Sequence, residues 1–252
     1  MKILLHVSFL GTNYCGYQIQ PNGITIQQRL NEATKALFGY DCDVVGCSRT
    51  DSGVHANQFC VAVSKKGTNQ ITTTIPIDRI SQAIAPYLPD DISVIHAESV
   101  ADSFHPRYDV KYKEYVYRIW NRPQRNPFLQ DRTWHYPKTI SDEALQKMND
   151  AASRWIGTHD FSAYMAADSK ITDAVRTIYE AQITRQGDVI EFRVSANGFL
   201  YNMVRILMGT LIAVAEGRIT PQDIDSITDS KDRSRAGITV PACGLFLNRV
   251  VY

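Results

Sequence analysis

The segment GCSRTDSGVHA (residues 46–56) places three side chains that can do chemistry, Arg49, Asp51 and His55, between two stretches with strand-like sequence. An ionised carboxylate in such a loop can act as a nucleophile or as a base. A β-turn is the alternative interpretation of Thr50–Gly53, because Asp, Ser and Gly are common turn residues. A turn alone, however, does not account for Arg49 and His55 beside it.

A second charged residue, Arg205, lies in a segment with helical periodicity, residues 199–216. Two adjacent apolar stripes predict that this helix is largely buried, and Arg205 falls within one of them. A buried guanidinium needs a carboxylate within reach. Asp51 differs from most acids of the chain, which fall on solvated helix faces or caps, so we predict an Asp51–Arg205 pair that keeps the carboxylate ionised. The alternative is that Arg205 extends to the surface or braces a helix C-terminus.

The first half of the chain reads as strand, helix, two strands, helix and strand. Alternating apolar residues predict the strands, and a stripe of Ile26, Leu30, Ala33 and Leu37 between Thr25 and Gly39 predicts the first helix. The expected elements cover residues 2–9, 25–39, 42–48, 57–65, 76–88 and 92–100.

The second half repeats this order. A strand at 114–120 is followed by a helix that Ser141 caps, by a hairpin turning at Gln186–Gly187, by the helix at 199–216 and by a closing strand at 244–252. The repetition predicts an α+β molecule of two ferredoxin-like halves, residues 1–103 and 104–252. We expect mainly antiparallel sheets with helices packed on them, and we expect the halves to share one continuous sheet and form one catalytic unit.

The net charge is only +1, which alone argues against a strongly basic nucleic-acid-binding protein. The charge is unevenly distributed, because residues 104–132 hold seven Lys/Arg against three Asp/Glu, interleaved with Phe, Tyr and Trp. Basic residues contact phosphates and aromatic faces stack on unpaired bases, so this segment suits RNA. An amphipathic strand with a solvated charged face is the alternative.

The five cysteines are Cys15, Cys42, Cys47, Cys60 and Cys243, and they contain no CxxC pair. An odd number without metal-ligand spacing favours reduced thiols over disulfides or zinc. The longest apolar run, residues 206–215, is about half the length of a membrane span. The N-terminal stretch reads as a strand rather than a secretory signal. We therefore expect a cytoplasmic protein without a membrane segment.

GCSRTDSGVHA and five further blocks, in order along nearly the whole chain, resemble the TruA-type tRNA pseudouridine synthases. GCSRTDSGVHA is close to that family's usual GAGRTDAGVHA. The other blocks are LGTNYCGYQIQPNGITIQQRL, DSFHPRYDVKYKEYVYRIWN, GTHDFSAY, GFLYNMVRILMGTL and CGLFLNRV. The resemblance implies two ferredoxin-like halves, a homodimer, a tRNA substrate, and no metal or other cofactor.

The resemblance also implies a role for each site residue. Asp51 would be the catalytic aspartate and Arg205, in YNMVR, its partner. Tyr115 would pack against the target uracil, and Leu245 would line the apolar side of the pocket. Arg49 would help to displace the target nucleotide or hold its phosphate, and His55 would support the same loop. Four residues that flank these groups depart from the usual family pattern and bear on target choice: Cys47, Ser48, Ser52 and Pro106.

The reaction implied is the isomerisation of uridine to pseudouridine at tRNA positions 38 to 40, in the anticodon arm. Three alternatives stay open: a non-catalytic RNA-binding module, a carboxylate-dependent glycosidase, and the same chemistry on another RNA. A glycosidase usually needs a second positioned acid, and none is evident beside Asp51. The sequence does not choose between attack of Asp51 on the sugar, attack on the base, or removal of a sugar proton. It does not identify which uridines and tRNAs are modified.

Overall fold

A computed structural model of the chain describes residues 1–169 and 171–252. The chain divides into two compact units, Met1–Lys111 with Phe246–Tyr252, and Tyr112–Leu245. The division predicted at residue 103 groups the closing strand with the second half. In the structure this strand, β10 (Leu245–Val251), pairs in parallel with β3 (His55–Lys65) of the first unit.

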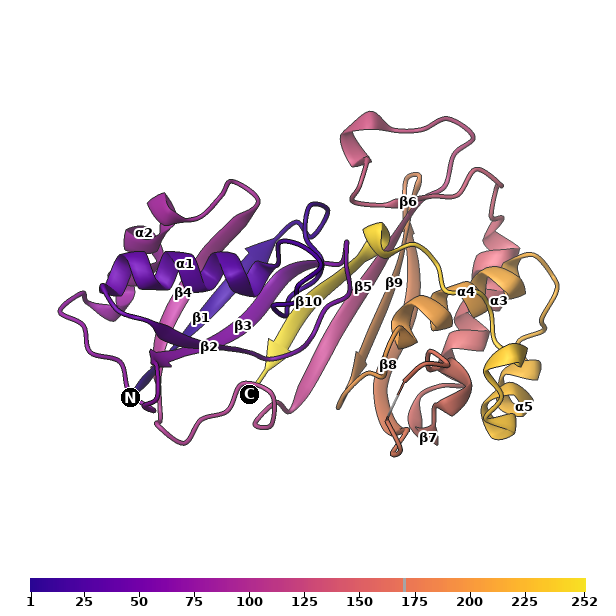
Figure 1. Cartoon of the computed structure of the whole chain (residues 1–252). Helices are drawn as coiled ribbons and strands as arrows, with labels where there is room; N and C mark the ends of the chain where they lie inside the picture. Colours follow the sequence, from indigo (N-terminus) through magenta and orange to yellow (C-terminus); the bar gives the residue numbers. More distant parts are fainter. Residues whose placement is uncertain (170) are drawn as a thin grey trace. The chain divides into compact units, whose positions relative to one another are not determined.

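The first unit follows the order strand, helix, two strands, helix, strand. Its elements are β1 (Lys2–Phe9), α1 (Ile26–Phe38), β2 (Cys42–Gly46), β3, α2 (Ile80–Ile84) and β4 (Ile92–Val100). The strands are antiparallel, with β1 between β4 and β3, and with β2 on the other edge of β3. This is the order of a ferredoxin-like β-α-β-β-α-β unit. Helices α1 and α2 lie on the same face of the sheet (Figure 1).

The ends of α1 are where the sequence predicts them. The Thr25 hydroxyl accepts a hydrogen bond from the Gln28 backbone N–H at 3.3 Å. Gly39 ends the helix in the left-handed conformation, at φ 76°. The predicted helix at 76–88 is shorter than expected, with a five-residue α2 between two 3₁₀ turns. Pro86 explains the early end, because proline has no N–H and disfavours helix in the residue before it.

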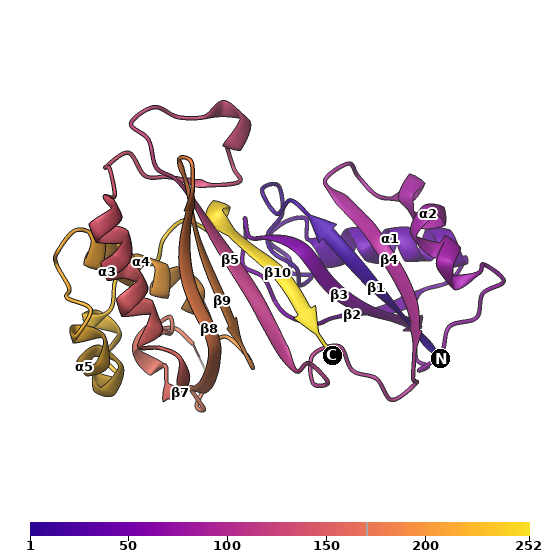
Figure 2. The ribbon, with the colours of Figure 1, turned by 180° about the vertical axis from the view of Figure 1, so that it is seen from behind.

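The second unit has an antiparallel sheet in the order β5–β9–β8–β7. These strands are β5 (Tyr112–Trp120), β7 (Gly157–Asp160), β8 (Val175–Gln186) and β9 (Val189–Ala196), and the short β6 (Trp134–His135) pairs in parallel with β5. Its helices are α3 (Asp142–Ser153), α4 (Met203–Ala215) and α5 (Asp223–Ser230). Figure 2 shows α3 along β8 and the long β8–β9 hairpin beside β5. The predicted α+β class with mainly antiparallel sheets is confirmed.

Candidate active site

Asp51 lies in the loop that joins β2 to β3. The Val54 N–H donates to the Asp51 carbonyl at 3.2 Å, which closes a turn over residues 51–54. Gly53, the third residue of this turn, has φ 78°. A positive φ at that position is the requirement of a type II turn and is strained for residues with a Cβ. The expected turn and the candidate carboxylate are therefore in the same place, and the turn fixes the backbone that carries Asp51.

A second loop, residues 10–17, holds this turn at close range. A Cβ on Gly11 would lie 2.0 Å from the Val54 carbonyl oxygen, and one on Gly16 would lie 2.4 Å from the Thr50 carbonyl oxygen. The Tyr17 N–H donates to the same Thr50 oxygen at 3.2 Å. Only glycine permits two backbones to approach so closely. The LGTNYCGY segment therefore has a physical role, which is to brace the Asp51 turn.

His55 completes the brace. Its ring is fully buried, and Nδ1 accepts a hydrogen bond from the Gly11 N–H at 2.9 Å. Because Nδ1 is an acceptor, the neutral ring carries its hydrogen on Nε2. The ring also lies against Phe246 of β10, with 4.6 Å between ring centroids. These contacts suit a residue that supports the loop.

Arg49 and Asp51 differ in exposure. Asp51 is half-buried, whereas Arg49 is exposed. Arg49 forms no ion pair with any residue that the structure describes, and a solvated guanidinium next to a pinned turn is suited to contact a phosphate.

The periodicity of residues 199–216 predicts that Arg205 lies in the middle of a buried helix, and the structure differs from this prediction. Helix α4 begins at Met203 rather than at 199, because Asn202 has a left-handed backbone at φ 60°. Arg205 is consequently in the first turn of α4 and is half-buried. Its Nε donates to the Val240 carbonyl at 2.7 Å, and its Nη1 donates to the Asn202 side-chain oxygen at 2.7 Å. A guanidinium is a rigid planar group, so these two bonds fix its orientation.

Val240 belongs to a segment, residues 237–241, that crosses α4 at close range; we call it the strap. A Cβ on Gly209 of α4 would lie 1.8 Å from the Ile238 carbonyl oxygen. The Gly237 N–H donates to the Thr210 hydroxyl at 2.9 Å. The strap and the helix thus touch backbone to backbone. This contact fixes the position of the Val240 carbonyl, which accepts the hydrogen bond from Arg205.

Tyr115 and Leu245 are both buried in the second unit, with 7% and 6% of their surfaces exposed. Tyr115 projects from β5, and its ring meets Phe199 edge-on, with 5.0 Å between centroids. Leu245 follows the strap and begins β10. The Tyr117 hydroxyl donates to the Pro241 carbonyl at 2.7 Å, which ties the end of the strap to β5.

The comparisons with known proteins decide the family. A family model described as tRNA pseudouridine synthase matches residues 5–109 and 151–252. A tRNA pseudouridine synthase A from Thermoanaerobacter sp. (strain X514) is 44% identical over 251 residues, which cover all of this chain and 99% of the relative. The chain belongs to the tRNA pseudouridine synthase family. Enzymes of the same name from Clostridium acetobutylicum and Acetivibrio thermocellus are each 41% identical, with 100% of this chain and 99% of each relative covered.

As a tRNA pseudouridine synthase the protein is an isomerase, and its predicted site residues divide evenly between its units. Arg49, Asp51 and His55 are carried by the first unit, and Tyr115, Arg205 and Leu245 by the second. Sequence reasoning missed the residues that position them, chiefly Gly11, Asn202 and Val240. Gly11 had a visible signal, because it is one of two glycines five residues apart in LGTNYCG, but a single carbonyl such as that of Val240 leaves no signal in a sequence.

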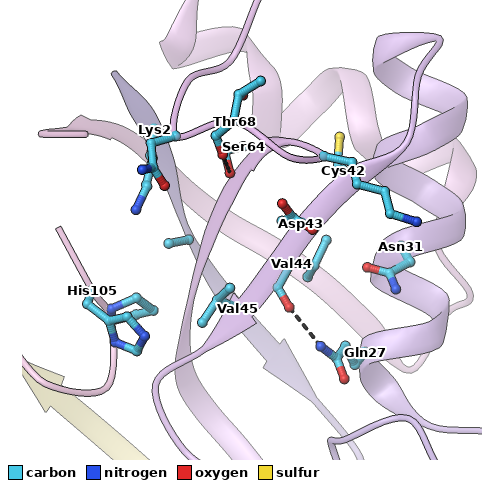
Figure 3. A pocket seen from close by; sticks show the side chains of 14 residues that line it. Lys2, Gln27, Asn31, Cys42, Asp43, Val44, Val45, Ser64, Thr68 and His105 are labelled. Atoms are coloured by element: carbon cyan, nitrogen blue, oxygen red, sulfur yellow. Dashed lines mark hydrogen bonds between the residues drawn. The ribbon is translucent and has the colours of Figure 1, made fainter. Parts of the chain in front are cut away.

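The synthase also has a pocket of about 430 Å³ in its first unit, beside β2 and α1 (Figure 3). Its lining is mixed, with amides, hydroxyls, two lysines and one acid: Lys2, Gln27, Asn31, Cys42, Asp43, Val44, Val45, Ala62, Ser64, Lys66, Thr68, Asn69, His105 and Pro106. None of the predicted site residues lines it. Among the residues described, no group of three or more His, Cys, Asp or Glu side chains could hold a metal ion. No helix in the described part of the chain is long and apolar enough to cross a membrane.

Proposed function

We propose that this synthase converts uridine to pseudouridine at positions 38 to 40 of the tRNA anticodon arm, with Asp51 as the catalytic carboxylate. The observation that carries the proposal is the Asp51 turn. It is closed by its own hydrogen bond and braced by Gly11, Gly16 and His55, in a chain that aligns from end to end with tRNA pseudouridine synthases. A reacting group held on a fixed backbone needs little reorganisation on binding its substrate.

The reaction is balanced without any co-reactant. The C1′–N1 bond of uridine breaks, the uracil turns while it stays bound, and C1′ forms a new bond to C5. The hydrogen displaced from C5 leaves as a proton, and N1 gains one. Asp51 would contribute as a nucleophile toward the sugar or the base, or as the base that removes a sugar proton.

We further propose that the two halves form one site, in which Arg205 pairs with Asp51. The proposal is supported by the way Asn202 and Val240 orient the Arg205 guanidinium. If the pair exists, Arg205→Met leaves an uncompensated charge, and Asp51→Asn should relieve most of the resulting loss of stability. Additive losses in urea unfolding of the single and double variants would exclude contact between the two side chains.

The remaining roles concern the target nucleotide. The base must leave its stack to be reached, which costs a few kcal/mol and least where pairing is already weak. We propose that Tyr115 and Leu245 hold the displaced uracil on its apolar faces and that the exposed Arg49 holds a phosphate. We also propose that the enzyme is a cytoplasmic homodimer, since two copies of the basic segment 104–132 in one dimer would add their fields along the RNA.

Tritium release from RNA transcribed with [5-³H]uridine tests the function. An anticodon arm with uridines at 38 to 40 is compared with a matched arm that has cytidine there and uridine elsewhere. We expect release from the first RNA only. Release from both arms or from neither, with the RNA bound, would contradict the assigned target. Binding without release from any cellular RNA would favour the binding module, and free uracil in the medium would indicate a glycosidase.

A further inference from the structure

Residues 121–133 form a long loop between β5 and β6, which we call the arm. In both views of the molecule the arm extends beyond the ends of β8 and β9 (Figures 1 and 2). At its far side a 3₁₀ turn, Pro127–Leu129, carries Phe128, a large apolar side chain that is 82% exposed. The arm falls between the two ranges that the family model matches, so that match assigns it no role.

Phe128 is held in place although its ring is in solvent. The Asn126 side-chain oxygen accepts a hydrogen bond from the Phe128 N–H at 3.0 Å. Arg132 Nη2 donates to the Phe128 carbonyl at 2.6 Å, and the Thr133 hydroxyl donates to the Leu129 carbonyl at 3.0 Å. Both backbone groups of Phe128 are therefore bonded to side chains of the arm itself. An aromatic ring on such a pinned turn loses little conformational freedom when it binds a partner.

The surroundings of Phe128 are basic. The arm contains three arginines, Arg122, Arg125 and Arg132, and one acid, Asp131. Arg122 is paired with Asp188 at 2.8 Å. Arg125 is exposed and forms no ion pair within residues 1–169 and 171–252. An exposed aromatic face beside an arginine that is not neutralised matches the chemistry of unpaired RNA, in which bases stack on aromatic rings and phosphates bind guanidinium groups.

We propose that the arm is an RNA-binding element in which Phe128 stacks on an unpaired base and Arg125 contacts the backbone phosphate beside it. The proposal rests on the proposed function, since the RNA in question is the tRNA substrate. Each nucleotide of an RNA offers both a base face for Phe128 and a phosphate charge for Arg125, whereas an apolar protein surface would accept the ring alone. The charge of the arm therefore favours RNA over a second copy of the chain.

The arm is far enough from the target base to contact other nucleotides. Trp120, where the arm begins, is five residues along β5 from Tyr115, which is about 17 Å at the rise of a strand. The arm nevertheless contacts the segment just before Leu245, because the Cys243 thiol donates to the Thr133 carbonyl at 3.5 Å. The arm should therefore contribute to the affinity for RNA and leave the chemical step unchanged.

The test measures tRNA affinity and turnover in Phe128→Ala, Phe128→Trp and Arg125→Gln. Tyr179→Ala, an exposed aromatic (51%) on β8, and Arg249→Gln, an exposed arginine of the first unit that forms no ion pair with the described residues, serve as matched controls. We expect Phe128→Ala to raise the Kd for a transcribed tRNA about 5- to 150-fold, the range for the loss of one stacked base, and we expect Phe128→Trp to bind like the wild type. Arg125→Gln should weaken binding and reduce the slope of log K against log[salt] by about 0.7 to 0.9. The kcat at saturating tRNA should not change, and the two controls should bind like the wild type.

Unchanged affinity in both Phe128→Ala and Arg125→Gln would overturn the proposal. A shift in oligomeric state of Phe128→Ala in sedimentation would also overturn it, because the ring would then lie between copies of the chain. These outcomes are distinct from a failure of the proposed function. The wild-type protein would in that case release no tritium, whereas the binding comparison between variants would still stand.

Discussion

The contact between α4 and the strap provides a sharp test of how Arg205 is positioned. In Gly209→Ala the new Cβ would start 1.8 Å from the Ile238 carbonyl oxygen, and real Cβ contacts are not closer than 3.0 Å. The strap and the helix must therefore separate by at least 1.2 Å. Both partners are backbone, so no side chain can turn aside to relieve the clash. If the strap takes up the whole movement, the 2.7 Å bond from Arg205 Nε to the Val240 carbonyl lengthens to about 3.9 Å and is lost.

Three contributions, of opposite sign, determine how the substitution changes the free energy of unfolding. Alanine in place of a helical glycine stabilises by about 1 kcal/mol through helix propensity. Overpacking costs about 1 to 3 kcal/mol, and losing a hydrogen bond to a charged group costs about 1.5 to 3 kcal/mol. The free energy of unfolding should therefore fall by about 1.5 to 5 kcal/mol. The kcat of the folded variant should fall as well, because the guanidinium is no longer held.

Urea unfolding and tritium release, measured on the same preparation, check both parts. Gly198→Ala is the matched control, since its new Cβ would lie 3.4 Å from the flexible Arg176 side chain. A Gly209→Ala protein that is more stable than the wild type and fully active would refute the argument, because the strap would then not set the position of Arg205.

Three further predictions concern the turn, its brace and an ion-pair cluster. Gly53→Ala should cost about 1 to 2 kcal/mol in urea unfolding and lower kcat, because alanine is strained at the φ of 78° that the Asp51 turn requires. An unchanged kcat would show that the turn geometry is not needed. His55→Ala should destabilise the protein by about 2 kcal/mol or more, since it leaves the buried Gly11 N–H without its acceptor and opens a cavity, whereas substitution of the exposed Arg49 by alanine should not change stability. Hydrogen bonds from Lys138, Tyr136 and Arg218 lower the pKa of Glu216 from 4.5 to about 2. A lowered carboxyl pKa adds stability that is fully present above about pH 4.5 and is lost as the pH falls toward 2. Because the Glu216 side chain is 22% exposed, we expect the wild type to lose about 2 kcal/mol of its free energy of unfolding over that pH window. Glu216→Gln should lose little. Equal acid sensitivity of the two proteins in thermal unfolding would show that this cluster is not a source of pH-dependent stability.

Local signals made several elements predictable from the sequence. Helix α1 is bounded by Thr25 and Gly39 because a capping hydroxyl and a left-handed glycine act within a few residues. The β8–β9 hairpin turns at Gly187, because glycine readily adopts the positive φ of 58° found there. The Asp51 turn was predictable from Ser52 and Gly53. Each of these features is determined by residues close together in the chain.

Three features of the structure were not predictable from the sequence, each for its own reason. The apolar stripes of residues 199–216 do not reveal that Asn202 turns the backbone before α4 begins, which moves Arg205 from mid-helix to the first turn. Helix α5 escaped notice because Ile224 and Ile227 are its only large apolar residues. Strand β10 was predicted as a strand, but its pairing with β3 joins residues almost two hundred positions apart, and no local pattern encodes such a pairing.

The most direct test of the central claim is single-turnover tritium release by Asp51→Asn, with enzyme in excess over an anticodon arm that carries uridines at 38 to 40. Asparagine keeps the size of the side chain and removes the carboxylate. If Asp51 is the catalytic carboxylate, the rate should fall roughly 10³-fold or more, while the Kd for the RNA stays within about threefold of the wild type. Release within about tenfold of the wild-type rate, from a variant that binds the RNA normally, would show that another group carries out the reaction.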